Sequence, residues 1–202
     1  MQATTSARTE LLIAIPYQPF EGNPARNEII LRALAEMPNL FPLRPETIEE
    51  RMIAVAYTLT APDSFAYEVW HGDRLCGIFL LTRIVPGLDA CGHLFFLDRQ
   101  LFGRTKLIQR IIGQAFERFR LERLTVEIPE HLKALQEFVR RKLMFRYEGE
   151  PRAIADGFAR ARSLAAWGSR REHSYWDGDT WRDHVILRLL RSEYEEFMTR
   201  GG

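Results

Sequence analysis

The stretch that decides the fold reads GHLFFLDRQLFGRTK, residues 92–106, in which an apolar strand passes through a short polar turn into an amphipathic helix. The turn contains Gly103, and the helix starts directly after it. The first turn of a helix has backbone N–H groups without helical carbonyl partners, so this junction gathers donors at one spot. Such a spot suits a phosphate, and we expect a phosphate-bearing cofactor here.

The helix after the turn is predicted by the period of its apolar residues. They recur on one side of a 3.6-residue repeat, with charged and amide side chains on the other. The apolar set is Leu107, Ile108, Ile111, Ile112, Ala115, Phe116 and Phe119. The pattern predicts a helix that packs on a sheet.

Strand patterns lie on both sides of this unit. Residues 64–70 and 74–85 precede it, and the turn sequences between the strands contain Gly72 and Gly87 with neighbouring aspartates. These residues supply the backbone freedom that a hairpin needs, so the three strands are predicted to form an antiparallel meander.

After the helix, residues 123–128 alternate apolar and polar side chains as a half-buried strand does, and Pro129 ends the run. A second amphipathic helix follows, and residues 145–148 and 183–190 are the last strand candidates. The apolar face of this second helix is formed by Leu132, Leu135, Phe138, Val139 and Leu143.

The N-terminal third predicts one strand and two helices. Residues 10–15 are the strand candidate. Asn23 and Pro24 are typical of an N-cap followed by the first helical residue, and residues 43–46 are predicted to begin the second helix.

This order of elements resembles that of the GCN5-related N-acetyltransferases, over residues 64–194. The family's acyl-CoA pyrophosphate loop reads Gln or Arg, two residues, Gly, one residue, then Gly or Ala. Gln100 and Gly103 match that loop, and Thr105 departs from it. Residues 143–149 are similar to the segment after the family's last helix, with Met144 where glycine is usual. Residues 183–194 resemble the closing strand of the branch that acetylates the N-termini of ribosomal proteins.

The resemblance implies an α/β fold with a mostly antiparallel sheet and a V-shaped splay between the fourth and fifth strands. It implies acetyl-CoA or another acyl-CoA as cofactor, no metal, and transfer of the acyl group to an amine acceptor. The backbone at the splay would bond the pantetheine arm, and the turn would hold the pyrophosphate. The implied cofactor-binding residues are Phe96, Leu97, Gln100, Leu101, Phe102, Gly103, Arg104, Thr105 and Lys106.

Glu127 is the predicted general base, because it alternates away from its apolar neighbours on the strand beside the splay. His93 is the second catalytic candidate, since histidine titrates in the right range. The alternative for both is a structural role, as an exposed sheet carboxylate and a histidine held by a structural partner. Arg140 stands where much of the family carries a tyrosine general acid. It cannot deliver a proton at neutral pH, although its charge could stabilise a thiolate.

Residues 150–181 are predicted to be an insertion between the last two strands, without a helical or strand period. Over residues 140–173 nine Lys or Arg residues stand against four acidic ones, interleaved with aromatic residues. This favours packing on the sheet or a contact with a second copy or assembly partner, which we rank above nucleic-acid binding. Thr105, Met144 and Arg140 also leave open a catalytically silent module of this fold that acts in binding or assembly.

The composition predicts one domain over residues 1–202, because 202 residues with 46% hydrophobic content can bury one substantial core. No run is long enough to span a bilayer, and residues 1–10 do not have the pattern of a signal peptide. Cys76 and Cys91 lack metal-ligand or redox spacing, so we expect buried thiols in a reducing cytoplasm. The formal net charge of +1 argues against attraction of the whole surface to nucleic acid or membrane.

Overall fold

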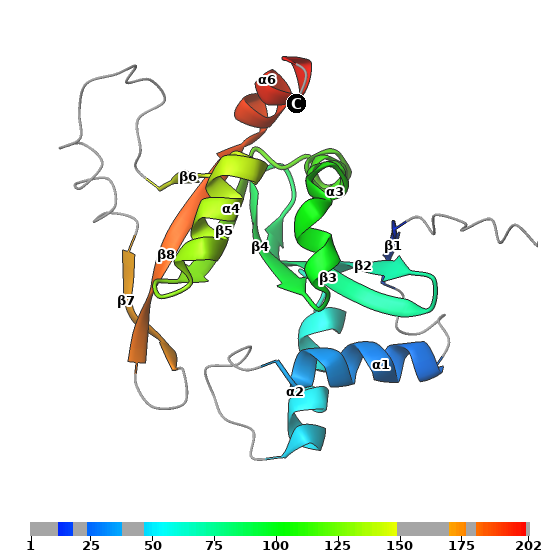
Figure 1. The fold of residues 1–202 in the computed structure, drawn as a ribbon. Helices are drawn as coiled ribbons and strands as arrows, with labels where there is room; N and C mark the ends of the chain where they lie inside the picture. The colour runs from blue at the N-terminus through cyan, green and yellow to red at the C-terminus, as the bar shows by residue number, and fades with distance from the viewer. Residues whose placement is uncertain (1–11, 18–23, 38–46, 149–169, 177–180, 201–202) are drawn as a thin grey trace, which may run out of the picture.

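The computed structural model describes residues 12–17, 24–37, 47–148, 170–176 and 181–200. One mixed sheet has the strand order β1-β2-β3-β4-β5-β8-β6, and β7 also pairs with β8 (Figure 1). The strands are β1 Leu12–Pro16, β2 Phe65–His71, β3 Arg74–Val85, β4 Asp89–Phe96, β5 Arg123–Pro129, β6 Arg146–Tyr147, β7 Arg170–Trp176 and β8 Trp181–Leu190. The helices are α1 Pro24–Ala35, α2 Ile48–Thr60, the 3₁₀ turn η1 Arg99–Gly103, α3 Thr105–Phe119, α4 Lys133–Leu143 and α6 Arg191–Thr199.

The predicted meander and splay are both confirmed. β2, β3 and β4 pair antiparallel in sequence order, and β4 then pairs with β5 in parallel. That parallel ladder runs from Asp89 opposite Arg123 to Gly92 opposite Val126. β4 continues to Phe96 and β5 to Pro129 without pairing with each other further, so the two strands open into a V.

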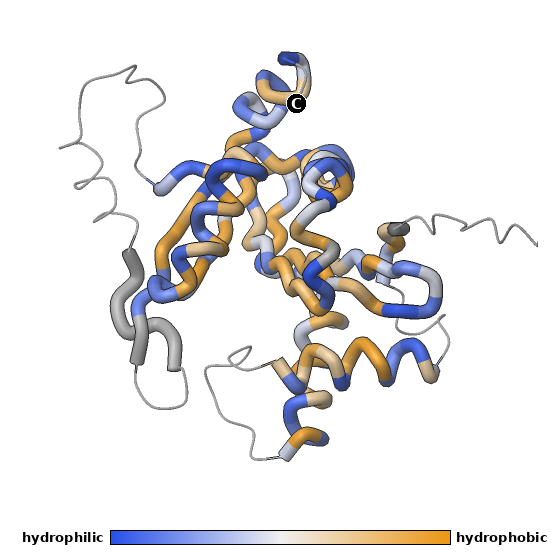
Figure 2. Tube along the Cα trace, in the orientation of Figure 1, coloured by the Kyte–Doolittle hydropathy of each residue, from blue (hydrophilic) through white to orange (hydrophobic). Residues whose placement is uncertain are grey.

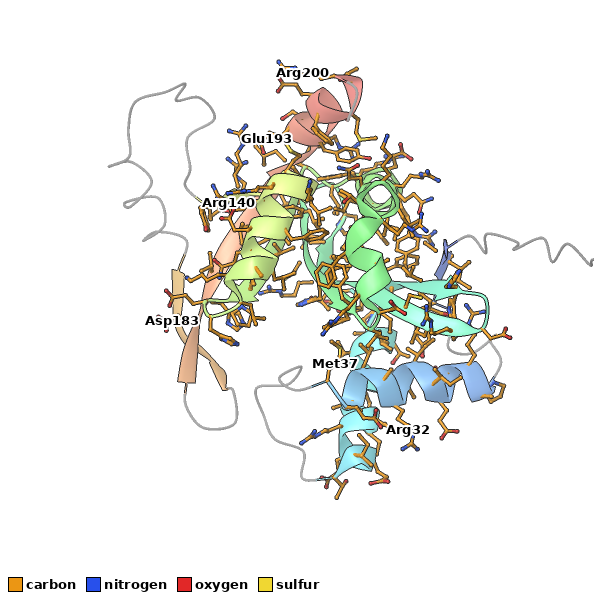
Figure 3. All side chains as sticks on the ribbon, in the orientation of Figure 1. Arg32, Met37, Arg140, Asp183, Glu193 and Arg200 are labelled. Carbon is orange, nitrogen blue, oxygen red and sulfur yellow. The ribbon has the colours of Figure 1, made fainter. Side chains whose placement is uncertain are left out.

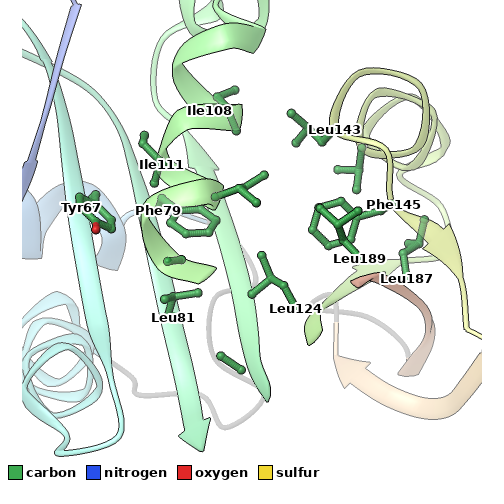
Figure 4. Packing of buried hydrophobic residues seen from close by; sticks show 14 of the residues in the cluster. Tyr67, Phe79, Leu81, Ile108, Ile111, Leu124, Leu143, Phe145, Leu187 and Leu189 are labelled. Atoms are coloured by element: carbon green, nitrogen blue, oxygen red, sulfur yellow. The ribbon is translucent and has the colours of Figure 1, made fainter. Parts of the chain in front are cut away.

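The sheet is covered on both faces, which strand alternation makes visible along β3. Phe79 and Leu81 belong to a core beneath α3 and α4, whereas Ile78 and Leu80 belong to a second core beneath α1 and α2. Figure 4 shows how the first core runs across the sheet from Tyr67 through Ile108 and Leu124 to Leu189. The hydropathy of the chain follows the same layers, with the apolar sides of α3 and α4 turned to the sheet (Figure 2).

One predicted boundary changes. α2 begins at Ile48, because the Thr47 hydroxyl accepts the Glu50 N–H and the Glu50 carboxylate accepts the Thr47 N–H in a capping box. Residues 10–11, 23 and 43–46, on which other N-terminal predictions fall, lie outside the described residues. Met144 ends α4 in the left-handed conformation with φ of 65°, which explains why glycine is the favoured residue here.

The segment 150–181, in which the sequence shows no helical or strand period, contains the strand β7 at residues 170–176. β7 pairs with the N-terminal half of β8, from Trp176 opposite Trp181 to Arg170 opposite Val185, and β6 pairs with the C-terminal half. β6 and β7 therefore follow one edge of β8 end to end. The sequence of β7 lacks the alternation of apolar and polar residues that would predict a strand. Residues 149–169 lie outside the described residues.

A C-terminal helix, α6, follows β8 where no helix was predicted, and it docks on α3 through Tyr194. The Tyr194 hydroxyl donates to the Gln109 carbonyl at 3.1 Å, and its ring lies 5.5 Å from that of Phe116. Gly113 makes this contact possible, because a Cβ there would lie 2.3 Å from the tyrosine oxygen.

Gly113→Ala is expected to lower the free energy of unfolding by about 1–2 kcal/mol, because the new methyl group collides with Tyr194. In a Tyr194→Ala background the same substitution is expected to raise stability by about 0.5–1 kcal/mol, since alanine is then only a better helix former. Urea unfolding of the four proteins in this cycle measures both effects. A stabilising effect in both backgrounds would show that α6 does not pack on Gly113.

Candidate functional site

The two predicted catalytic residues come together where the parallel ladder ends. Gly92 and Val126 are the last pair, so His93 and Glu127 are the first residues of the open V. Paired residues of parallel strands share a face of the sheet, and Val126 packs against the core beneath α3 and α4. His93 and Glu127 therefore lie on the opposite face, where Leu80, the β3 partner of His93, belongs to the core beneath α1 and α2.

Arg83 is the functional candidate that the sequence did not reveal. Its guanidinium Nη2 donates to Glu127 Oε1 at 2.8 Å, and this hydrogen bond raises the pKa of Arg83 above its usual range. The Glu127 side chain is 15% exposed and that of Arg83 is 57% exposed. Arg83 lies in the irregularity of the β3–β4 ladder between Thr82 and Val85, with φ of 52°. The bulge breaks the alternation of β3, and only the pairing with β4 shows it.

His93 is held as a neutral imidazole. One of its ring nitrogens, Nε2, is 2.9 Å from the hydroxyl of Thr82. Burial lowers the pKa of His93 to about 4; the charge of Glu127 opposes this, and that of Arg83 adds to it. Both side chains stand at the start of the V, and Glu127 is the one that contacts Arg83.

The predicted phosphate turn is a 3₁₀ turn that uses part of its own donors. The Leu101 N–H donates to the Asp98 carbonyl at 3.1 Å, and the Arg104 N–H donates to the Leu101 carbonyl at 3.0 Å. No side chain of the described residues caps α3 at Arg104. The N–H groups of Leu101 and Arg104 are therefore removed from the predicted donor set. Those of Thr105 and Lys106, the first two residues of the helix, remain in it, because the first turn of a helix has N–H groups without helical partners.

Around the turn, Leu101 is buried, whereas Gly103, Arg104 and Lys106 are exposed. Leu101 is fully buried against Gly77, so its contribution is structural. A Cβ at Gly103 would meet nothing within 4 Å, and Gly103 does not occupy the left-handed region. The fold itself does not require glycine there, and the open space suits the close approach of a ligand. Arg104 and Lys106 are exposed beside it. The side chain of Gln100 lies outside the described residues.

Three phenylalanine rings bridge the open V on the side of α3 and α4. Phe96 at the end of β4 stacks on Phe102 of η1 with ring centroids 4.1 Å apart, and Phe138 of α4 meets them edge-on at 5.5 and 5.4 Å. Phe102 is 43% exposed. A ligand that enters the V from the phosphate turn would pass along these rings. Sequence analysis had placed Phe138 only in the core.

Of the two residues predicted to offer backbone contacts, Phe96 is kept and Leu97 is replaced. The Leu97 and Asp98 N–H groups both donate to the Cys76 carbonyl, at 3.0 and 2.9 Å, so the Leu97 N–H points to β3. Backbone groups of successive strand residues alternate between the two neighbours. Those of Leu94 and Phe96 are therefore directed to the open side of β4, and Leu94 replaces Leu97 in the candidate site.

Arg140 lies away from the V. Its Nη1 is 3.1 Å from Glu137 Oε1, and its guanidinium carbon is 4.5 Å above the ring of Tyr147. Figure 3 shows Arg140 on the side of α4 turned away from α3. The predicted charge stabilisation of a thiolate by Arg140 is not compatible with this position. The side chains of Cys76 and Cys91 are buried, as predicted, and both carry reduced thiols.

Comparisons with known proteins address the fold. No family model matches the chain, and no curated protein matches it in sequence. A mutant form of the spermidine/spermine N-acetyltransferase SpeG from Vibrio cholerae matches with a TM-score of 0.67 at 12% identity, over 93% of this chain and 98% of that one. The spermidine N-acetyltransferase from Vibrio cholerae in complex with CoA and spermine matches with a TM-score of 0.65 at 13% identity, over 91% and 98%. The chain has the GCN5-related N-acetyltransferase fold.

In the described chain, the Arg83–Glu127 pair and the stacked Phe96 and Phe102 rings lie at the V of this fold. None of the helices in its described part is long and apolar enough to cross a membrane.

His93 is expected to make the acetyltransferase fold less stable as the pH falls from about 6.5 to about 4. In this window the unfolded chain binds a proton at His93 and the folded chain does not, because burial lowers the folded pKa. The expected loss is about 1–3 kcal/mol. Urea unfolding as a function of pH measures it, and His93→Gln is expected to flatten that part of the profile. His131→Gln, at an exposed histidine, is the control that keeps it; equal profiles for both variants would contradict the assignment.

Proposed function

We propose that this protein is an acyl-CoA-dependent N-acyltransferase that moves an acetyl group to an amine. The observation that carries the proposal is the open V. The edge of β4 that no longer pairs with β5 and the Glu127 carboxylate border it, and the turn after β4 leads to the N-terminus of α3. A matching structure of the same fold holds CoA and spermine, which supports a CoA-type cofactor here.

The cofactor side of the site runs along β4 and the turn. Backbone groups of Leu94 and Phe96 would hold the amides of the pantetheine arm. The N–H groups of Thr105 and Lys106, at the positive end of α3, would hold the pyrophosphate, and the charges of Arg104 and Lys106 would add to them. The bound cofactor supplies the acetyl group as an activated thioester. The phenylalanine rings supply apolar contact beside the arm.

The acceptor side is the face that carries Glu127. An amine is protonated at neutral pH and must lose a proton before its nitrogen can attack the thioester carbonyl. The Glu127 carboxylate takes that proton, directly or through one water. The new C–N bond forms as the C–S bond breaks, and the thiolate leaves to be protonated by solvent. Arg83 holds Glu127 at the mouth of the V through the 2.8 Å contact.

Gly103→Val is expected to raise the Kd for CoA by about tenfold or more, because its side chain fills the space that the pyrophosphate would need. The free energy of unfolding should change by less than about 0.5 kcal/mol, since nothing in the chain occupies that space. Thr105→Ala is the opposite change and is expected to lower the Kd, since it removes a branched side chain beside the same backbone. Isothermal titration calorimetry measures all three proteins. Equal affinities would place the pyrophosphate elsewhere.

Glu127→Gln is expected to lower kcat about 10²- to 10⁴-fold with an unchanged Kd for acetyl-CoA, because the amide keeps the shape but cannot take the proton. Glu130→Gln is the matched control, since Glu130 follows β5 and pairs with Lys133 on the surface. Thiol release from acetyl-CoA with a mixture of amines measures both. Full activity of the Glu127 variant would rule this carboxylate out as the base.

A silent binding module of the same fold is the second candidate. The phenylalanine rings that bridge the V and the position of Arg140 favour it, because neither supplies a group for the leaving thiolate. Binding of acetyl-CoA without turnover of any amine would support this candidate over the enzyme.

A further inference from the structure

The least exposed carboxylates among the ion pairs of the described chain all contact arginines. Four acidic side chains in these pairs are the least exposed, at 5%, 9%, 15% and 15%, and each contacts an arginine. They are Glu68 with Arg26, Glu193 with Arg188, Asp98 with Arg74 and Glu127 with Arg83. A polyamine acceptor is recognised through carboxylates that carry uncompensated charge. At each of these four positions it would first have to displace a guanidinium.

The pair at the V has the geometry of an exchangeable contact. Glu127 is mostly buried, but Arg83 is 57% exposed and reaches it from the β3 bulge across β4. A half-exposed guanidinium can turn to a second carboxylate and bind it through two parallel N–H donors. The charges of Arg83 and Glu127 cancel, so a neutral zwitterion that enters between them leaves the net charge of the site unchanged.

We propose that the acceptor is an amine that carries its own carboxylate close by, as a free α-amino acid does. Its carboxylate would bind the Arg83 guanidinium and its ammonium would bind the Glu127 carboxylate, so that two ion pairs replace one. The spacer must be short, because Nη2 and Oε1 are only 2.8 Å apart before the exchange.

This inference rests on the proposed acyltransferase function. Glu127 receives the ammonium proton, the amine nitrogen forms the bond to the acyl carbon as the C–S bond breaks, and the carboxylate on Arg83 is unchanged. Arg83 is therefore a residue that binds substrate and selects among amines, and Glu127 is the base.

The test compares acceptors that differ in the carboxylate alone. Product formation from acetyl-CoA is followed by mass spectrometry with common free amino acids, with their carboxamides, and with spermidine. The expected kcat/KM for the amino acids exceeds that for their amides by about tenfold or more, because the amide lacks the charge that Arg83 binds. Spermidine is expected to be the poorest acceptor.

Three variants separate the role of Arg83 from a structural one. Arg83→Asn removes the guanidinium with a residue that tolerates the positive φ, and it is expected to abolish the preference for amino acids over amides. Arg83→Lys restores the charge without the paired donors and should restore part of the preference. Arg123→Gln breaks a comparable ion pair with Asp89 at the other end of β5 and should keep all of it. Thermal unfolding confirms that each variant is folded.

The outcomes distinguish this inference from the proposed function. Acetylation of amides or spermidine by the wild-type protein as readily as amino acids would overturn the acceptor class and leave the acyltransferase standing. Equal losses on all acceptors in Arg83→Asn would assign Arg83 to structure alone. Absence of any acetylated product, with CoA binding intact by calorimetry, would overturn both.

Discussion

The end of the parallel ladder at Gly92 and Val126 is the constraint on which the rest of the structure depends. β4 leaves β5 because its end is drawn to β3, where the Cys76 carbonyl accepts two successive N–H groups from Leu97 and Asp98. Gly77 permits this approach, since a Cβ there would lie 2.7 Å from the Phe95 oxygen and 2.5 Å from Leu101. β5 meanwhile follows β8 as far as Pro129. The V is thus the consequence of two ladders that hold β4 and β5 to different neighbours.

Backbone donors, positive charge and a carboxylate lie around this opening. On one side lie the end of β4, the 3₁₀ turn and the N-terminus of α3, which together offer backbone donors and positive charge. On the other face lies Glu127, the first residue of β5 beyond the last pair, beside a neutral His93. Arg83 lies in a bulge of β3, and its side chain crosses β4 to reach Glu127 on β5. Because the carboxylate and the guanidinium are already paired, an acceptor with one charge of each sign fits the site better than a polycation.

Sequence reasoning singled out Glu127 because strand parity is a local property, and it singled out His93 for the titration range of its side chain; their catalytic roles stay predictions. A residue that alternates away from apolar neighbours faces the other side of the sheet, whatever that strand pairs with. The same reasoning mistook Leu97 for Leu94, because the direction of each N–H depends on the register with β3, which no single strand contains. It missed Arg83 for a related reason, since a bulge is defined by two strands. It placed Arg140 by counting along α4, and the side of the helix that meets the V is instead the one that carries Phe138.

The sequence by itself determined the order of the elements other than β7 and α6, the apolar faces of α3 and α4 and the turn around Gly103, because periodicity and turn chemistry act over a few residues. Only the tertiary structure decided where β4 and β5 part, that a polar segment becomes β7, that α6 docks through Tyr194 on Gly113, and that Arg83 meets Glu127. Each of these depends on atoms from segments far apart in the chain. Such contacts form only when the sheet assembles, because no local pattern specifies which distant partner a side chain or a backbone group will find.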